Sequence, residues 1–148
     1  MTKQNKMNKY QLETKLTVCW NRNIKTRLLR EFAKERGYTW DITGDACKGD
    51  EVIFARALFS GSYPKAKYDS DEVIIGTITR DSYGAAKQQH TFTITQECGS
   101  RITIKGRNLY SIAVFAKPRV DRAKDLEDKH ARGNKARKAR KQRRSSQQ

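Results

Sequence analysis

Nine lysines and arginines lie between Lys129 and Arg144 with no acidic residue among them. Cationic side chains at this density pair with phosphate oxygens, and their binding releases the counterions that a polyanion has condensed. The segment therefore predicts contacts to a phosphate backbone, although a solubility tail or a localisation signal has the same composition. The nine residues are Lys129, Arg132, Lys135, Arg137, Lys138, Arg140, Lys141, Arg143 and Arg144.

A second basic group accompanies an apolar stripe of helical spacing between Ile24 and Arg36. The stripe predicts an amphipathic helix with its N-cap at Asn21 or Asn23 and its end near Gly37. The cations predict a face that contacts phosphate, with an ordinary solvated face as the alternative. The apolar residues are Ile24, Leu28, Leu29, Phe32 and Ala33, and the candidate contacts are Arg22, Lys25, Arg27, Arg30 and Lys34.

A few further candidate contacts to nucleic acid lie outside these two basic groups. Arg101, Lys105 and Arg107 come late in the chain and extend the basic surface. Tyr83 and Tyr110 are candidates for stacking on bases, each with a place in the core as the alternative. Trp20 carries the same two interpretations. Little in these residues indicates readout of base edges, so weak sequence preference is expected.

The positive charge is unevenly distributed along the chain. The 148 residues carry a formal net charge of +16, which favours a polyanionic partner such as nucleic acid. Residues 1–43 contribute +6, residues 44–116 contribute +1 and residues 117–148 contribute +9. Electrostatic binding is therefore expected mainly from the two ends of the chain rather than from its middle.

Metal binding and catalysis are not expected from this sequence, and no cofactor is predicted. Cys19, Cys47 and Cys98 lie far apart, without the close pairs that zinc sites use. Neither a phosphate-binding loop nor a nucleophile elbow is present. Two acidic clusters could hold Mg²⁺ in a nuclease, but solvation of turns is the favoured interpretation. The clusters comprise Asp45, Asp50, Glu51, Asp69, Asp71 and Glu72.

Alternating β-branched residues between Gly49 and Tyr110 predict the elements that position these cations. Strands are expected at residues 50–54, 72–79, 90–95, 101–105 and 112–115, with a loop at 64–71 and a flexible connection at 85–89. Gly76, inside the second strand, predicts a bulge, a bend or a close backbone approach. The run from Leu16 to Trp20 also predicts a strand.

These elements predict four parts of the chain. Residues 1–9 form a disordered basic N-terminus, and residues 10–43 a strand and the basic amphipathic helix. Residues 44–116 form a small β-barrel, and residues 117–148 a basic tail that is helical or disordered. The expected fold class is α+β, mainly β.

The segment from Lys48 to Phe115 resembles SH3-like barrels of the KOW/Tudor kind. The likeness rests on the Gly49-Asp50 opening, on Gly76 within the second strand, on the hairpin around Gly99 and on the short closing strand. The polar connection from Ser60 to Asp71 departs from that pattern. The basic flanks around a barrel also resemble the MotB-type early DNA-binding proteins of T-even phages. The resemblance implies a binding module that contacts RNA, DNA or a partner protein.

Two functional hypotheses follow. The first is a non-enzymatic protein that binds DNA or RNA, largely independently of sequence, through the basic helix and tail. The second is an adaptor or inhibitor whose barrel docks on a protein of the transcription, translation or nuclease machinery. No apolar run approaches a membrane span and no secretory signal is apparent, so a cytoplasmic location, on the nucleoid or a ribonucleoprotein, or the nuclear equivalent is expected.

Overall fold

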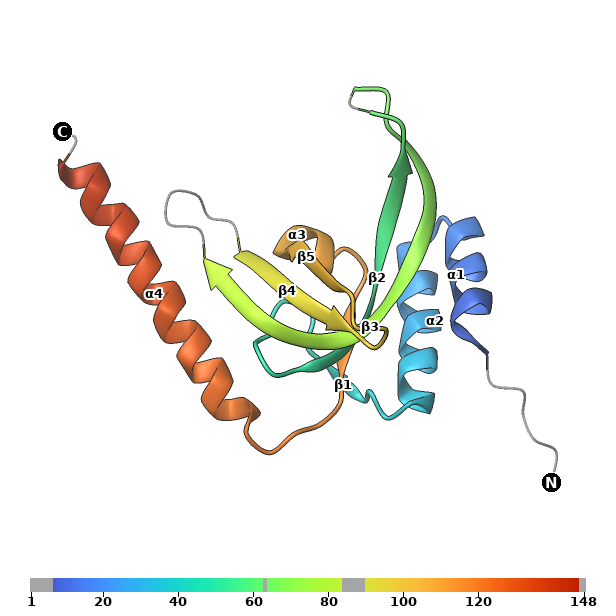
Figure 1. Cartoon of the computed structure of the whole chain (residues 1–148), viewed down its shortest axis with the longest axis horizontal. Coiled ribbons are helices and arrows are strands. Elements are labelled where there is room, and N and C mark those ends of the chain that lie inside the picture. The colour runs from blue at the N-terminus through green and yellow to red at the C-terminus, as the bar shows by residue number, and fades with distance from the viewer. Residues whose placement is uncertain (1–6, 63, 84–89, 147–148) are drawn as a thin grey trace.

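A curled six-stranded sheet organises the chain (Figure 1). The computed structural model describes residues 7–62, 64–83 and 90–146. All strand pairs are antiparallel, in the order β1-β6-β2-β3-β4-β5. The strands are β1 (Trp40–Asp41), β2 (Glu51–Ser60), β3 (Lys67–Tyr83), β4 (His90–Gln96), β5 (Arg101–Lys105) and β6 (Val114–Ala116).

Four helices accompany the sheet: α1 (Lys9–Val18), α2 (Arg22–Glu35), α3 (Gly106–Leu109) and α4 (Arg122–Ser146). The predicted α+β class is confirmed, with most of its β-structure between residues 44 and 116, although β1 precedes that range. Among the described strands, no pairing joins the edge strands β1 and β5, so the sheet is open. None of the helices within the described residues has the length and apolar character needed to cross a membrane.

Successive side chains of β2 pack into two separate hydrophobic cores, one on each face of the sheet. Val52 and Phe54 join a cluster inside the curl, together with Phe92 of β4. Ile53 and Ala55 join a second cluster beneath α1 and α2. Strand side chains alternate between faces, so the uninterrupted burial of residues 52–55 fits a strand with two covered faces.

The predicted strand from Leu16 to Trp20 is wrong, because most of this segment belongs to α1. Asn8 and Gln11 form a capping box that starts the helix. Leu12 and Leu16, four residues apart, are both fully buried on one helical face. Val18 and Trp20 carry the strand propensity of the run, but both are exposed. Burial of the leucine pair therefore prevails over local β propensity.

Helix α1 also covers an edge of β3 that lacks a partner strand. Over residues 67–75 the described pairings join β3 to β2 alone. Glu13 accepts a hydrogen bond from the Val73 amide at 2.7 Å, and Thr17 accepts one from the Asp71 amide at 3.0 Å. Exposed strand edges invite pairing with other chains, and these side chains block part of this edge.

The amphipathic helix predicted between Ile24 and Arg36 is confirmed as α2. Asn21 is its N-cap and accepts a hydrogen bond from the Ile24 amide at 3.1 Å. Leu29, Phe32 and Ala33 are buried, as the apolar stripe predicts. After α2, the short strand β1 lies between Tyr38 and Ile42.

Gly76 lies where the backbones of β3 and β4 approach closely. A Cβ atom at this position would lie 2.5 Å from the Thr95 carbonyl oxygen and 2.9 Å from Cγ2 of Ile94. The predicted close approach is confirmed. Further along β3, the register of its pairing with β4 shifts between Ile78 and Arg80.

Strand boundaries differ from expectation at β2, which continues beyond residue 54 to Ser60, at β6, which begins at Val114 rather than at residue 112, and at β3. This strand begins at Lys67, within the predicted loop at 64–71, because residues 67–71 pair with β2. A short helix, α3, precedes the last strand, β6. The predicted flexible connection at 85–89 lies outside the described residues.

Candidate nucleic-acid interface

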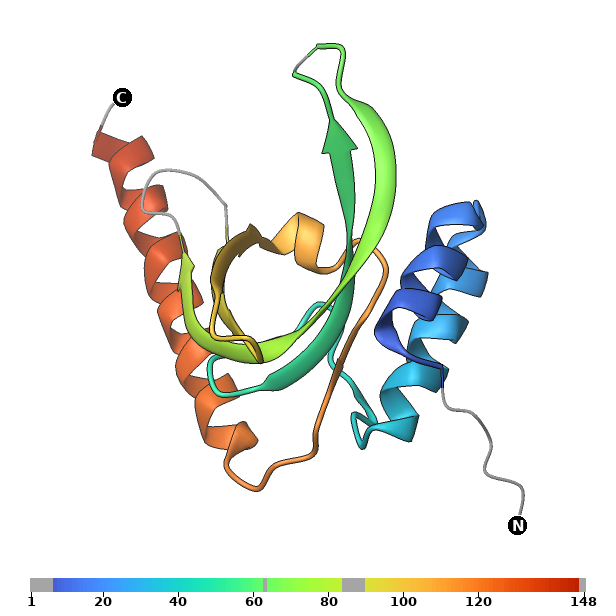
Figure 2. The same cartoon turned by 45° about the vertical axis from the view of Figure 1, so that its right-hand side comes forward.

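The basic C-terminal segment lies on a helix, α4, of 25 residues. At a rise of 1.5 Å per residue its length is about 37 Å. Figures 1 and 2 show α4 on one side of the curled sheet, with α1 and α2 on the opposite side. Of the two expected states of the tail, helical or disordered, the helical one is present over residues 122–146.

Asp50 fixes the start of α4 to the sheet. Its carboxylate is fully buried. It accepts a hydrogen bond from Nε of Arg119 at 2.9 Å and from Nε of Arg122 at 3.1 Å. Arg119 also pairs with Asp125 at 2.5 Å, and Arg122 donates to the Asp45 carbonyl oxygen at 2.5 Å. One buried carboxylate therefore binds two guanidinium groups at the junction between the sheet and α4.

Cys47 completes the surroundings of Asp50. Its amide donates to the Asp50 carboxylate at 3.0 Å, and its thiol lies 3.5 Å from the same oxygen. Burial, together with the negative charge of Asp50, raises the pKa of Cys47 to about 11. The thiol is therefore protonated at neutral pH and adds no second negative charge to the site.

A second anchor lies further along α4 at Asp81 of β3. Arg132 pairs with the Asp81 carboxylate at 2.6 Å, and the Lys48 amide donates to its other oxygen at 3.0 Å. The Asp81 side chain is almost completely buried. Arg132 also pairs with Asp128 of its own helix at 3.2 Å. This arginine therefore serves first to hold α4 on β3.

The structure does not support Lys129 as a phosphate contact. Its side chain is buried and its ammonium lies 5.9 Å from the centre of the Phe92 ring. Asp45 lies 3.9 Å away. Burial lowers the pKa of Lys129 from its ordinary value, and Asp45 offsets this effect only in part. Lys129 belongs to the basic run of the sequence, but in the structure its side chain packs against the sheet.

Beyond Arg132 the cations of α4 lie at the surface. Between α4 and the end of β3 lies a groove of about 380 Å³, lined by Arg80, Lys135, Arg143, Ala136 and Ala139, with Arg132 and its partner Asp81 also among its lining residues. The other basic residues past Asn134 are exposed or half-buried: Arg137, Lys138, Arg140, Lys141 and Arg144. This distal half of α4 is the most strongly basic surface among the described residues.

The α2 cations divide into exposed and engaged groups. Arg27 and Lys34 are exposed. Lys25 pairs with Asp71 at 2.5 Å, and Arg30 lies over the Phe115 ring at 5.7 Å. Burial alone would lower the pKa of Lys25, but its hydrogen bond to Asp71 and the charge of that carboxylate raise it above the ordinary value. Arg22 is exposed and makes a long hydrogen bond to a backbone carbonyl.

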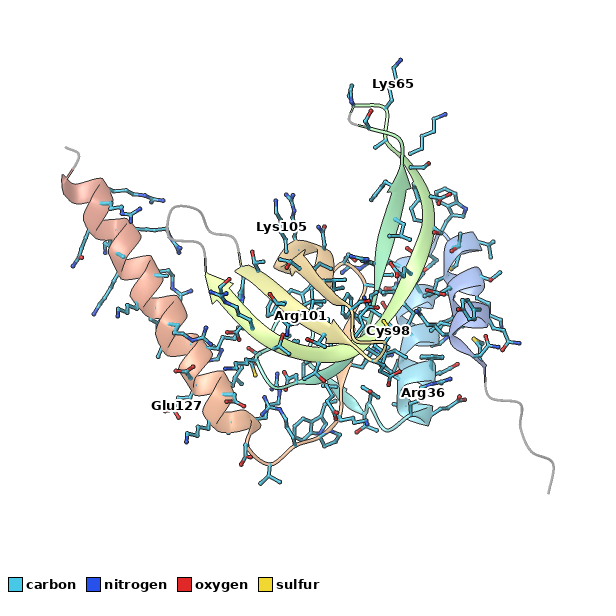
Figure 3. The ribbon with its side chains drawn as sticks, in the orientation of Figure 1. Arg36, Lys65, Cys98, Arg101, Lys105 and Glu127 are labelled. Carbon is cyan, nitrogen blue, oxygen red and sulfur yellow. The ribbon has the colours of Figure 1, made fainter. Side chains whose placement is uncertain are left out.

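Arg101, Lys105 and Arg107 are all exposed, at β5 and α3. Figure 3 shows Lys105 projecting away from the sheet beside α3 and Arg101 at the start of β5. Lys105 and Arg107 share the rim of a groove with Arg56. The predicted contacts thus occupy three separate places, and α2 and α4 do not form one continuous surface (Figure 2).

The two tyrosine candidates have different outcomes. The Tyr110 ring packs against the inner core and meets Phe92 edge-on at 6.1 Å between centroids. Its hydroxyl accepts a hydrogen bond from the Ala46 amide at 2.9 Å. This placement favours the core role for Tyr110. The side chain of Tyr83 lies outside the described part of the structure.

Most of the acidic residues considered for Mg²⁺ instead pair with basic residues. Glu51 pairs with Lys117 at 3.8 Å and Glu72 with Arg56 at 3.1 Å, beside the pairs of Asp45, Asp50 and Asp71. Within residues 7–62, 64–83 and 90–146, no group of three or more potential metal ligands comes together. Several of these carboxylates join the sheet to its basic flanks, a role that sequence reasoning missed because the partners are distant in sequence.

Comparisons with known proteins find similarity centred on the sheet. Residues 47–118 match the family described as Domain of unknown function (DUF7699). This range covers β2 to β6 and ends one residue before Arg119. A relative in Oryza sativa subsp. japonica, Zinc finger CCCH domain-containing protein 62, is 38% identical over an alignment of 115 residues that covers 66% of this chain. The match spans only 16% of that protein. No solved structure matches the chain.

Proposed function

We propose that this protein is a non-enzymatic nucleic-acid-binding protein that contacts the phosphate backbone largely independently of base sequence. The principal contacts are the cations of α4 beyond Asn134. Exposed cations of α2 and of the β5–α3 region provide secondary contacts. The partner is DNA or RNA, and the location that follows is cytoplasmic or nuclear, in association with nucleic acid.

The observation that carries the proposal is the anchoring of α4 by buried acids. Asp50 and Asp81 engage Arg119, Arg122 and Arg132, all at the near end of the basic segment. Asp50 and Asp81 are thus already paired with arginines near the start of α4. The distal helix, from Lys135 to Arg144, contains seven basic residues and no acid. A solubility tail would need no such attachment.

Repulsion within the distal helix also supports a polyanionic ligand. Arg137 and Lys141 are four residues apart, as are Arg140 and Arg144. Like charges at this spacing each destabilise a helix by roughly 0.2–0.5 kcal/mol. Phosphate groups along the helix would relieve this repulsion, so binding and helix stability should reinforce each other.

For the sheet, we place β2 to β6 with SH3-like barrels of the KOW/Tudor kind. In support, β2 pairs both with the next strand, β3, and with the last strand, β6. The short helix α3 lies directly before that last strand. The relative from Oryza sativa carries a zinc-finger domain in its name, but the small share of that protein that is matched transfers no activity to this chain.

Truncation after Asn134 tests the proposed function without disturbing the anchors. The shortened chain keeps Arg119, Arg122, Lys129 and Arg132. We expect it to fold, and to lose most of its affinity for duplex DNA, single strands and structured RNA in gel-shift titrations. Unchanged affinity would contradict the proposal. Capture of one stoichiometric protein that survives nuclease treatment, with no nucleic acid bound, would favour the adaptor hypothesis.

A further inference from the structure

An aromatic cluster lies on the α1/α2 side of the molecule, away from α4. Trp20, between the two helices, is 90% exposed, and Phe59 at the end of β2 is 62% exposed. Both rings lie beside Tyr68 of β3, with centroid separations of 6.4 Å and 6.2 Å. Large aromatic rings at such exposure have apolar surface that a ligand can cover.

A pocket of about 240 Å³ opens beside Trp20 and Tyr68. Arg22 and Lys25 also line it, and Ser111 adds a hydroxyl. The Lys25 ammonium lies 5.4 Å from the centre of the Tyr68 ring while it pairs with Asp71. Aromatic rings, two cations and the Asp71 carboxylate that pairs with Lys25 thus border the same pocket.

We infer that this Trp20–Tyr68 pocket binds an unpaired nucleobase of a single strand, with Arg22 beside the adjoining phosphate. The inference rests on the proposed function and narrows it, because duplex DNA presents no free base face. Single-strand binding proteins combine stacking side chains with a positive groove. A second copy of this chain is a poor occupant, because each copy carries a net charge of +16.

Two lysines near the pocket lie along the path that a bound single strand of nucleic acid would take. Lys67 starts β3 beside the Phe59 strand end, and it is exposed. Figure 3 shows Lys65 near the tip of the same hairpin, pointing into solvent. A nucleic-acid strand that extends from Trp20 to Phe59 would contact an aromatic ring at each end. It would then reach Lys67 and Lys65 along the β2–β3 hairpin.

Tryptophan fluorescence tests the inference directly, because the chain has only two tryptophans. Trp40→Phe leaves Trp20 as the sole reporter. Titration with oligothymidylate should quench its emission, whereas a duplex of equal length should quench it much less. Trp20→Ala should weaken oligothymidylate binding roughly tenfold, the effect of losing one stacked base, and should leave duplex binding within about twofold.

Val18→Ala is the matched control, since Val18 is 71% exposed and lacks a ring. It should change neither affinity, and Trp20→Tyr should recover part of the single-strand binding. Absence of quenching by oligothymidylate, with duplex binding intact, overturns the inference and leaves the proposed function standing. Absence of binding to every nucleic acid overturns both. Quenching by a captured acidic protein, but not by oligothymidylate, also overturns the inference.

Discussion

Asp50 and Arg119 lie 69 positions apart in the sequence and form an ion pair of 2.9 Å, in which the carboxylate is fully buried. Arg122 binds the same carboxylate. The pairs join the first long strand of the sheet to the base of α4. They explain how a nearly neutral sheet holds a strongly basic helix in a defined position.

Replacement of Asp50 by asparagine should leave Arg122 without its paired carboxylate and Arg119 with Asp125 alone. Removing one partner of a buried ion pair costs roughly 3–5 kcal/mol, and the partial exposure of the arginines places this case at the lower end. We expect a lower free energy of unfolding in urea and a loss of helical circular dichroism from α4.

The matched control for this prediction is Asp125→Asn, because Asp125 binds the same Arg119 from a half-exposed position. Its cost should stay below about 1 kcal/mol. Equal destabilisation by the two substitutions would refute the anchoring role of Asp50.

Gly76→Ala should destabilise the sheet by about 3 kcal/mol, since overpacking at a fixed backbone forces neighbouring strands apart. The added methyl group would meet the Thr95 carbonyl oxygen at 2.5 Å. Gly99→Ala provides a comparison: its φ of +91° is unfavourable for alanine, but its surroundings are open. Its cost should be about 1–2 kcal/mol, and thermal unfolding of both variants would establish the order.

His90 should make stability depend on pH below neutrality. Burial, followed by the charge of Lys129, lowers the pKa of His90 to about 4 from 6.5. Asp81 and Arg132 also act on it, in opposite directions. The folded state therefore binds this proton less readily than the unfolded chain. The stability contributed by neutral His90 is present above pH 6.5 and is lost as the pH falls towards 4.

His90→Gln should accordingly flatten the dependence of unfolding free energy on pH across that interval, whatever its effect at neutral pH. A wild-type slope in His90→Gln would show that other groups govern the acid sensitivity.

The predictability of the fold followed the range of the interactions involved. Alternation and capping are local, so β2 to β6 and α2 were predictable from the residues, with the N-cap of α2 narrowed to Asn21 or Asn23. Helix α1 was not, because Val18 and Trp20 suggest a strand while the decisive burial of Leu12 and Leu16 depends on the sheet. Gly76 was predicted to mark a bulge, a bend or a close backbone approach, but neither the choice among these nor the partner Thr95 could be predicted.

The candidate interface was predictable in composition but not in geometry. The basic runs indicated where the charge lies along the chain. They could not show that Lys129 is buried, or that Arg132 is engaged by Asp81 at a distance of 51 positions. The exposed ring of Phe59 also went unrecognised, since its strand position resembles that of a core residue.

Repulsion along α4 predicts that polyanions increase its helical content. Heparin or duplex DNA should strengthen the helical circular dichroism signal of the wild-type protein, because phosphate or sulfate groups offset like-charge pairs. The chain truncated after Asn134 should show little change. An equal increase in both proteins would assign the effect to another segment.

The salt dependence of duplex binding tests the role of α4 most directly. The test variant replaces Arg137, Lys138, Lys141 and Arg144 by glutamine, and the control replaces four exposed or half-buried cations on the opposite side, Lys9, Lys15, Arg27 and Lys34. We predict that the test variant binds duplex DNA much more weakly. The negative slope of its log affinity against log salt should become shallower by about 2 to 4, because each phosphate contact contributes roughly −0.9 to that slope. The control should change both quantities less. Equal affinity and slope in the wild type and the test variant would contradict the proposed role of α4.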